Sequence, residues 1–180
     1  MRAFITSLVL TLATPASASD CLVITGASVH LPDGPVQIDL RLDGDNISGI
    51  GAVNAENCDT IDGAGQTVTA GFVGVLTHLG LVEIGLESGT RDEAGSGSVN
   101  AALRVADAYN PRSAVIGVQR VEGITSSVVV PGGGFISGQA AWADLVGGHQ
   151  ANAVRDPSIA IVANIHGYGS RAESLLRLRE

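Results

Sequence analysis

Apolar and polar side chains alternate along residues 36–43. Successive side chains of a β-strand point to opposite faces, so this pattern predicts a strand with one buried face and one solvated face. Shorter apolar stretches at residues 21–29 and 47–50 are separated from it by the turn sequences Pro32-Asp33-Gly34 and Asp43-Gly44-Asp45-Asn46. Together they predict a small antiparallel β-unit before residue 70.

The pattern changes after Gly71, where residues 72–79 form a continuous apolar run. Such a run is typical of a strand that is buried on both faces of a parallel sheet. Strands are also predicted over residues 123–130 and 158–165, and helices over residues 99–108, 113–121, 139–146 and 171–179. The alternation of strands and helices predicts a βα series.

Three βα units are fewer than the eight that close a (β/α)₈ barrel. We therefore interpret the chain as the N-terminal part of a longer fold. A complete three-stranded α/β domain stays open as the alternative.

The N-terminus has the pattern of an export signal. Arg2 provides the positive charge, residues 3–13 an apolar segment, and Ala16-Ser17-Ala18 a small-x-small cleavage site. The signal would cover residues 1–18 and place the protein in the periplasm or outside the cell, without membrane association after cleavage. A buried or membrane-spanning N-terminal helix is the alternative, but a spanning helix needs roughly 20 apolar residues.

Two cysteines occur, Cys21 and Cys58. In an oxidising compartment this pair predicts a disulfide within the β-unit. The alternative is two separate buried thiols.

The net charge of −8 argues against nucleic acid and anionic membranes as partners, because both require clusters of basic residues. The sequence also contains no lysine. This excludes a phosphate-loop lysine, a lysine Schiff base and a Ser-x-x-Lys nucleophile within these residues.

Several segments resemble, in order, the opening of the amidohydrolase superfamily, in its imidazolonepropionase-like, exported branch. The segments are Gly26-Ala-Ser-Val-His30, the hairpin of residues 42–51, residues 62–69, Gly71-Phe-Val through Thr77-His-Leu-Gly80, Gly123-Ile-Thr, Val130-Pro131 and Ile136-Ser-Gly-Gln139. The ordered set covers nearly all of the chain after residue 18.

The resemblance implies an α/β fold. It would be an incomplete (β/α)₈ TIM-like barrel, with its first three βα units in residues 71–180, preceded by part of a small composite β-sandwich in residues 19–70. It also implies metal-dependent hydrolysis of a C–N bond, in an amide, a cyclic amide or a peptide-like small molecule, by water bound to zinc or another divalent metal in a complete parent protein. His78 would be a metal ligand at the carboxyl end of a strand.

The chain departs from the family pattern Pro-Gly-φ-φ-Asp-x-His-x-His. Ala70, Gly74 and Leu76 stand where the family has Pro, Asp and the first His. The family's later ligands, a carboxylated Lys, two His and an Asp, would come from residues beyond Glu180. A catalytic zinc site needs three protein ligands, so this chain alone is expected to hold no metal and to be inactive. The alternative is a non-catalytic binding or scaffold protein.

Other polar residues are weaker site candidates, and no catalytic residue or organic cofactor is predicted. His149 and His166 could replace a missing ligand, but both lie beside Gly in predicted loops. His30 follows a strand and is expected to be solvated. Glu83 and Glu87 could reach the mouth of the fold, although loop carboxylates are usually only exposed.

Overall fold

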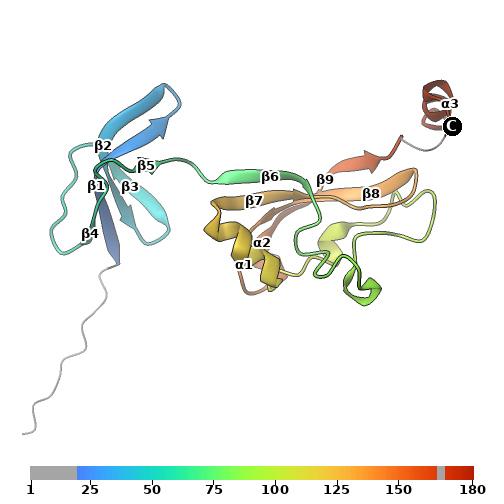
Figure 1. The fold of residues 1–180 in the computed structure, drawn as a ribbon, viewed down its shortest axis with the longest axis horizontal. Coiled ribbons are helices and arrows are strands. Elements are labelled where there is room, and N and C mark those ends of the chain that lie inside the picture. Colours follow the sequence, from blue (N-terminus) through green and yellow to red (C-terminus); the bar gives the residue numbers. More distant parts are fainter. Residues whose placement is uncertain (1–19, 166–168) are drawn as a thin grey trace, which may run out of the picture. The chain divides into compact units, whose positions relative to one another are not determined.

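The computed structural model describes residues 20–165 and 169–180, which form two compact units divided between Ala70 and Gly71. Figure 1 shows a small β-unit and a larger mixed unit. The strands are β1 Cys21–Leu31, β2 Gly34–Asp43, β3 Asn46–Ile50, β4 Asp59–Asp62, β5 Thr67–Val68, β6 Phe72–Thr77, β7 Ile124–Val129, β8 Ile136–Asp144 and β9 Val154–Ala163. The helices are the 3₁₀ turns η1 Ser88–Thr90 and η2 Val105–Asp107, and the α-helices α1 Ala114–Val121, α2 Gln150–Ala153 and α3 Arg171–Arg177.

The first unit is one five-stranded sheet in the order β3-β2-β1-β4, with β5 also paired to β1. The neighbours β1, β2 and β3 are antiparallel and are joined by two-residue turns, as the sequence predicts. Leu31 pairs with Gly34 across the first turn, and Asp43 pairs with Asn46 across the second. Gly44 has a φ of 56°, which a glycine adopts without steric cost.

A bulge in β1 and a disulfide shape this unit. The register of β1 against β2 shifts between Ile24 and Ala27, where the N–H of Gly26 donates to the carboxylate of Asp39 at 2.7 Å. Cys21 and Cys58 form the predicted disulfide, which ties the start of β1 to the loop before β4. The apolar core is small, so this crosslink matters for its stability. The core residues are Ala27, Val29 and Leu40, with Ile24, Leu31, Ile38 and Val68 packed against them.

The second unit is built on a four-stranded sheet in the order β6-β7-β8-β9. The strands β6 and β7 are parallel, and the other two pairs are antiparallel. The apolar core joins this sheet to α1, η2 and α2. Its buried members are Leu81, Val105, Ala106, Tyr109, Ile116, Val129, Ala141, Ala143, Leu145 and Ala153.

The predicted fold class is wrong. The described chain is mostly β-structure in two mixed sheets, rather than the first three βα units of a (β/α)₈ barrel. Only β6 and β7 are joined as a parallel pair in the second sheet, and the chain then returns through antiparallel β8 and β9. The predicted strands at residues 123–130 and 158–165 are present, as are the helices at residues 113–121 and 171–179.

The helix predicted over residues 139–146 is instead strand β8, and this single error removes one βα unit. Ala and Gln favour helices, but β8 is a central strand with partners on both sides, and such a strand shows no clean polar alternation. Tertiary pairing overrides the local preference.

The helix predicted over residues 99–108 is also absent. Instead, this segment contacts β8 through isolated bridges of Val99 with Ile136 and of Arg104 with Gln139. The N–H of Asn100 donates to the Ile136 carbonyl, and the N–H of Gln139 donates to the Leu103 carbonyl. Only residues 105–107 form a 3₁₀ turn. The apolar spacing of this segment comes from packing on the sheet.

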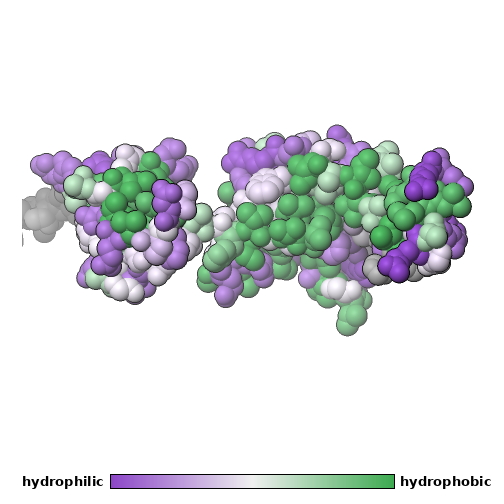
Figure 2. Space-filling view, turned by 90° about the horizontal axis from the view of Figure 1, so that it is seen from above, coloured by the Kyte–Doolittle hydropathy of each residue, from purple (hydrophilic) through white to green (hydrophobic). Residues whose placement is uncertain are grey.

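The strand predicted at residues 72–79 is present as β6, but it is not buried on both faces. It is an edge strand of its sheet, and its side chains at Phe72, Val73, Val75 and Leu76 are exposed. Figure 2 shows apolar surface spread over one face of the second unit. An exposed apolar edge strand favours association with other chains.

The predicted export signal at residues 1–18 lies outside the described residues. Within the described part of the chain, no helix is long and apolar enough to cross a membrane. The disulfide is compatible with the predicted periplasmic or secreted location.

Candidate functional site

The carboxyl ends of β6 and β7 lie at the same edge of their sheet, because these two strands are parallel. Thr77 is paired with Val129, and the N–H of Val130 donates to the Thr77 carbonyl at 2.9 Å. His78 follows β6 directly. The strand ends therefore place His78 beside the loop that begins at Val130.

The ring of His78 is fixed from one side. Its Nδ1 lies 3.0 Å from the carbonyl oxygen of Val130. A carbonyl can only accept, so Nδ1 carries a hydrogen, and in the neutral ring Nε2 has the lone pair. A histidine that binds a metal is usually oriented in this way by a hydrogen bond from its other nitrogen.

Two hydroxyl groups, those of Ser127 and Thr77, hold the strand just before His78. Ser127 is fully buried, and its Oγ lies 3.0 Å from the carbonyl oxygen of Gly74 and 2.6 Å from Thr77 Oγ. These contacts span the β6 segment whose register against β7 shifts between Gly74 and Thr77. The position of His78 is therefore set by β7 as well as by β6.

Leu76 lies within the bulge and points into solvent. Its φ is 57°, a left-handed value that is unfavourable for a branched side chain, and 70% of its surface is exposed. Leu76 stands where the family pattern has its first His. The structure thus has an exposed, strained apolar residue at a position that the resemblance assigns to a metal ligand.

A buried carboxylate that the sequence did not single out lies near His78. The side chain of Glu93 is 6% exposed, and Arg91 forms an ion pair with its Oε1 at 2.5 Å. Burial opposes ionisation of Glu93, but the hydrogen bonds from Arg91, a backbone hydrogen bond at Glu93 itself and the smaller electrostatic effects of Arg91 and His78 outweigh burial and lower the pKa of Glu93. Its Oε2 is buried and has no hydrogen-bond partner.

Gly132 lies next to the side chains of both His78 and Glu93. A Cβ atom at this position would lie 3.3 Å from Cγ of Glu93 and 3.6 Å from Cε1 of His78. The N–H of Gly132 also donates to the Glu93 carbonyl at 2.8 Å, and Ala94 forms a β-bridge with Gly132. Because Gly132 has no side chain, His78 and Glu93 can both lie against it.

The other predicted candidates do not join this group. Glu83 accepts a hydrogen bond from Asn110 at 3.3 Å, and Glu87 caps η1 by accepting from the Gly89 N–H. His149 is exposed before α2, and His30 is exposed at the end of β1. His166 lies outside the described residues.

The residues present do not fit a catalytic metal. No group of three or more His, Cys, Asp or Glu side chains in residues 20–165 and 169–180 is arranged to hold a metal ion. His78 offers one imidazole, and the nearby Glu93 is already paired with Arg91. Three protein ligands are required for a catalytic zinc.

The sequence matches no protein-family model and no curated protein. Among solved structures, an amidohydrolase from Thermotoga maritima MSB8 matches with a TM-score of 0.74 and 19% sequence identity. The likeness is one of fold. The match covers 88% of this chain and 45% of that amidohydrolase, so the chain spans less than half of its length.

A second polar cluster lies away from the carboxyl ends of β6 and β7 and fastens β7, β8 and β9 together. Asp144 accepts hydrogen bonds from Ser126 at 2.9 Å, Trp142 at 3.4 Å and Arg155 at 2.5 Å. Burial opposes ionisation of Asp144, but these three donors outweigh it and lower its pKa. Asp144 and its three donors, here called the Asp144 clamp, thus hold the second sheet together in addition to its backbone hydrogen bonds.

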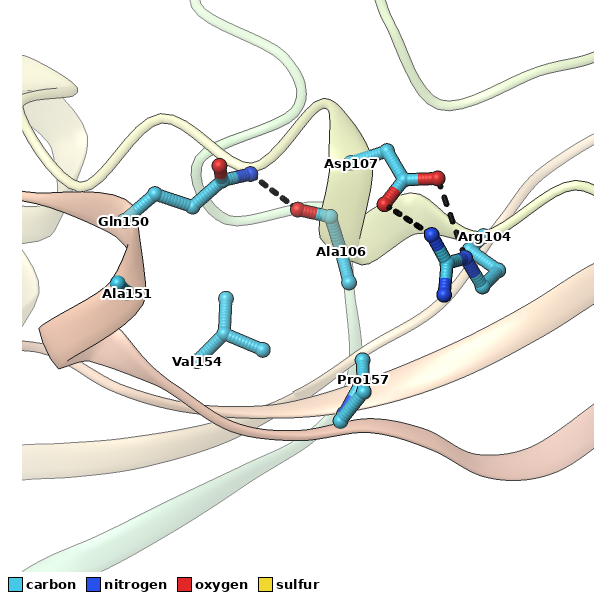
Figure 3. Close-up of a pocket in the computed structure, with 7 residues that line it drawn as sticks. All are labelled: Arg104, Ala106, Asp107, Gln150, Ala151, Val154 and Pro157. Carbon is cyan, nitrogen blue, oxygen red and sulfur yellow. Dashed lines mark hydrogen bonds and ion pairs between the residues drawn. The ribbon is translucent and has the colours of Figure 1, made fainter.

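A cavity of about 320 Å³ lies between η2, α2 and β9 (Figure 3). Figure 3 shows the ion pair of Arg104 with Asp107, and the hydrogen bond from the Gln150 amide to the Ala106 carbonyl. The polar groups of this cavity are already paired with one another. It contains no nucleophile and base arranged for catalysis.

Arg91 and Glu93 could not be identified from the sequence, because they lie in a segment rich in Gly and Ser that predicts a solvated loop. Two β-bridges anchor this loop, Val82 with Arg91 and Ala94 with Gly132. No signal in the sequence distinguishes Glu93 from its exposed neighbour Asp92.

Proposed function

We propose that this chain is a segment of an amidohydrolase-like protein that does not hydrolyse amides by itself. Its parent activity would be metal-dependent hydrolysis of a C–N bond in an amide or cyclic amide, with His78 as the one ligand that these residues supply. The observation that carries the proposal is the fixed imidazole of His78 at the carboxyl end of β6, with Nε2 left able to accept.

Two further observations support it. The likeness to the Thermotoga maritima amidohydrolase extends over 88% of the chain. Glu93, held by Arg91, lies near His78, and no group of three or more His, Cys, Asp or Glu side chains in the described part of the chain is arranged to hold a metal ion. Additional ligands would have to come from other residues of the parent protein.

The test is an assay of the purified chain against a panel of simple amides, cyclic amides and dipeptides, with and without added zinc. We expect no hydrolysis above that of buffer in either condition. Hydrolysis that needs both zinc and an intact His78, and that is lost in His78→Ala, would contradict the proposal. The variant His149→Ala is the matched control, because His149 is exposed and lies in another loop.

A binding or scaffold role is the second candidate, and the exposed Leu76 in place of a ligand favours it. The two candidates differ in the metal content of the native polypeptide. Protein purified from its natural source without chelators would contain stoichiometric metal and hydrolyse an amide if it is an enzyme. A metal-free preparation that stays inactive with added zinc would favour the scaffold.

A further inference from the structure

The cavity of about 320 Å³ between η2, α2 and β9 has fixed walls. An isolated β-bridge between Arg104 and Gln139 joins the start of η2 to β8, and β9 pairs with the same strand. The side-chain amide of Gln150 donates to the Ala106 carbonyl and so links α2 to η2. The cavity therefore keeps its shape without a ligand.

The guanidinium of Arg104 is held at the wall of this cavity by Asp107. Its Nε and Nη2 donate to the two oxygens of the Asp107 carboxylate, at 3.1 and 2.9 Å. This pairing uses one side of the guanidinium only, because a guanidinium has five N–H groups, and those of Nη1 and the second hydrogen of Nη2 remain at its end. No described residue accepts from them. The Arg104 side chain is 48% exposed, so a ligand can reach this end.

Most of the remaining lining of the cavity is apolar. The apolar residues are Ala106, Ala151, Val154 and Pro157. Figure 3 shows that the end of the guanidinium turned away from Asp107 faces the space between Ala106 and Pro157. The charge of Asp107 is balanced by Arg104 itself. The cavity thus presents two neighbouring N–H donors beside an apolar surface.

We propose that this cavity binds a small carboxylic acid with an apolar body. Its carboxylate accepts from Nη1 and Nη2 of Arg104, and its carbon chain or ring lies against Val154 and Pro157. A carboxylate matches the paired donors of a guanidinium, and such charge-assisted bonds are stronger than bonds between neutral groups. The volume lies at the lower end of the range of about 300–1,000 Å³ that is typical of ligand pockets, which suits a small molecule. The inference goes beyond the proposed function, because it requires neither His78 nor a metal.

Titration of the ¹⁵N-labelled chain with cyclohexanecarboxylate tests the proposal. We expect saturable shifts of the backbone amides of Ala106, Asp107 and Ala151, with a dissociation constant of about 1 mM, as suits a ligand with few atoms. Acetate lacks the ring and cyclohexylmethanol lacks the charge, so each should bind at least about tenfold more weakly. Binding of either compound as tight as that of cyclohexanecarboxylate, or no saturable shift in the native chain, would overturn the proposal.

A first pair of variants tests the contact with the carboxylate. Arg104→Met should weaken the binding of cyclohexanecarboxylate at least about tenfold, because it removes both donors. Arg120→Met is the matched control and should leave binding unchanged, since Arg120 is exposed on α1 and does not line the cavity. Native-like binding in Arg104→Met, or an equal loss in the two variants, would overturn the inference.

A second pair of variants tests the cavity and leaves the guanidinium intact. Ala151 is exposed at the cavity wall, so the larger side chain of Ala151→Phe should fill the cavity and abolish the saturable shifts. Asn152→Phe, at the next exposed position of α2, should bind as the native chain does. Unchanged binding in Ala151→Phe would place the ligand elsewhere and overturn the inference. Such a failure would leave the hydrolysis assay unaffected, so the two proposals fail separately.

Discussion

Arg91 and Arg104 are equally exposed, at 48% each, but their carboxylate partners differ: Glu93 is 6% exposed and Asp107 is 62% exposed. Comparing the two ion pairs therefore separates the contribution to stability of a buried carboxylate partner from that of an exposed one.

Replacing Arg91 by Met should destabilise the second unit by about 1–3 kcal/mol, because it leaves the Glu93 carboxylate buried without its donor. Arg104→Met, at the same exposure, should change stability by no more than about 0.5 kcal/mol. Urea unfolding followed by the fluorescence of Trp142, the one tryptophan of the sequence, measures both. Equal losses in the two variants would contradict the assignment of Glu93 as a buried charge.

Leu76→Gly should stabilise the second unit by about 0.5–1 kcal/mol, because it removes left-handed strain at φ 57° and loses little packing from an exposed side chain. Val75 is similarly exposed, at 65%, and does not have a positive φ. Val75→Gly should therefore destabilise by about 0.5–1 kcal/mol, through the greater freedom of glycine in the unfolded chain. If both variants change stability in the same direction, strain at Leu76 is not the cause.

Loss of the disulfide should weaken the first unit. Cys21 and Cys58 are 37 residues apart in sequence, so the crosslink stabilises by about 3–4 kcal/mol in the chain-entropy description. The double variant Cys21→Ser/Cys58→Ser should show faster amide exchange throughout β1 and β2, and the native chain with reductant should behave alike. Two free thiols in the denatured, unreduced protein would refute the pairing itself.

The Asp144 clamp should make stability depend on pH in the acid range. The pKa of Asp144 is lowered in the folded state from its ordinary value of 3.8, so the clamp contributes fully above that value and is lost as the pH falls through the lowered pKa. The difference in unfolding free energy between the native chain and Asp144→Asn should therefore be largest near neutral pH and disappear in strong acid. A difference that is independent of pH would mean that charge plays no part in the clamp.

Much of the first unit could be predicted from the sequence because its signals are local. Residues 36–43 alternate cleanly, and both turns contain the Gly and Asp residues that tight turns require. The disulfide followed from the presence of two cysteines in a β-rich segment. These features depend on neighbours a few residues apart.

The second unit could be predicted only in part because its decisive contacts are distant in sequence. Residues 139–146 contain helix-forming Ala and Gln, yet β8 is fixed by pairing with β7 and β9. The exposure of Val75 likewise depends on the place of β6 at the edge of the sheet. Periodicity alone does not reveal which strand lies at an edge.

The candidate site was predicted through one residue. His78 stood out because its place in the motif resembles a known family, whereas Glu93 was missed because its burial is created by bridges of its loop to Val82 and Gly132. The hydrogen bond to Val130 spans 52 residues and has no counterpart in the local sequence.

Zinc titration of the purified, metal-stripped chain by calorimetry, with zinc counted after gel filtration, tests the central claim most directly. With one oriented imidazole and no group of three ligands in residues 20–165 and 169–180, we expect no zinc to remain bound after filtration. Retention of one zinc per chain, abolished by His78→Ala and preserved in His149→Ala, would show that this chain builds a metal site by itself and would contradict the account.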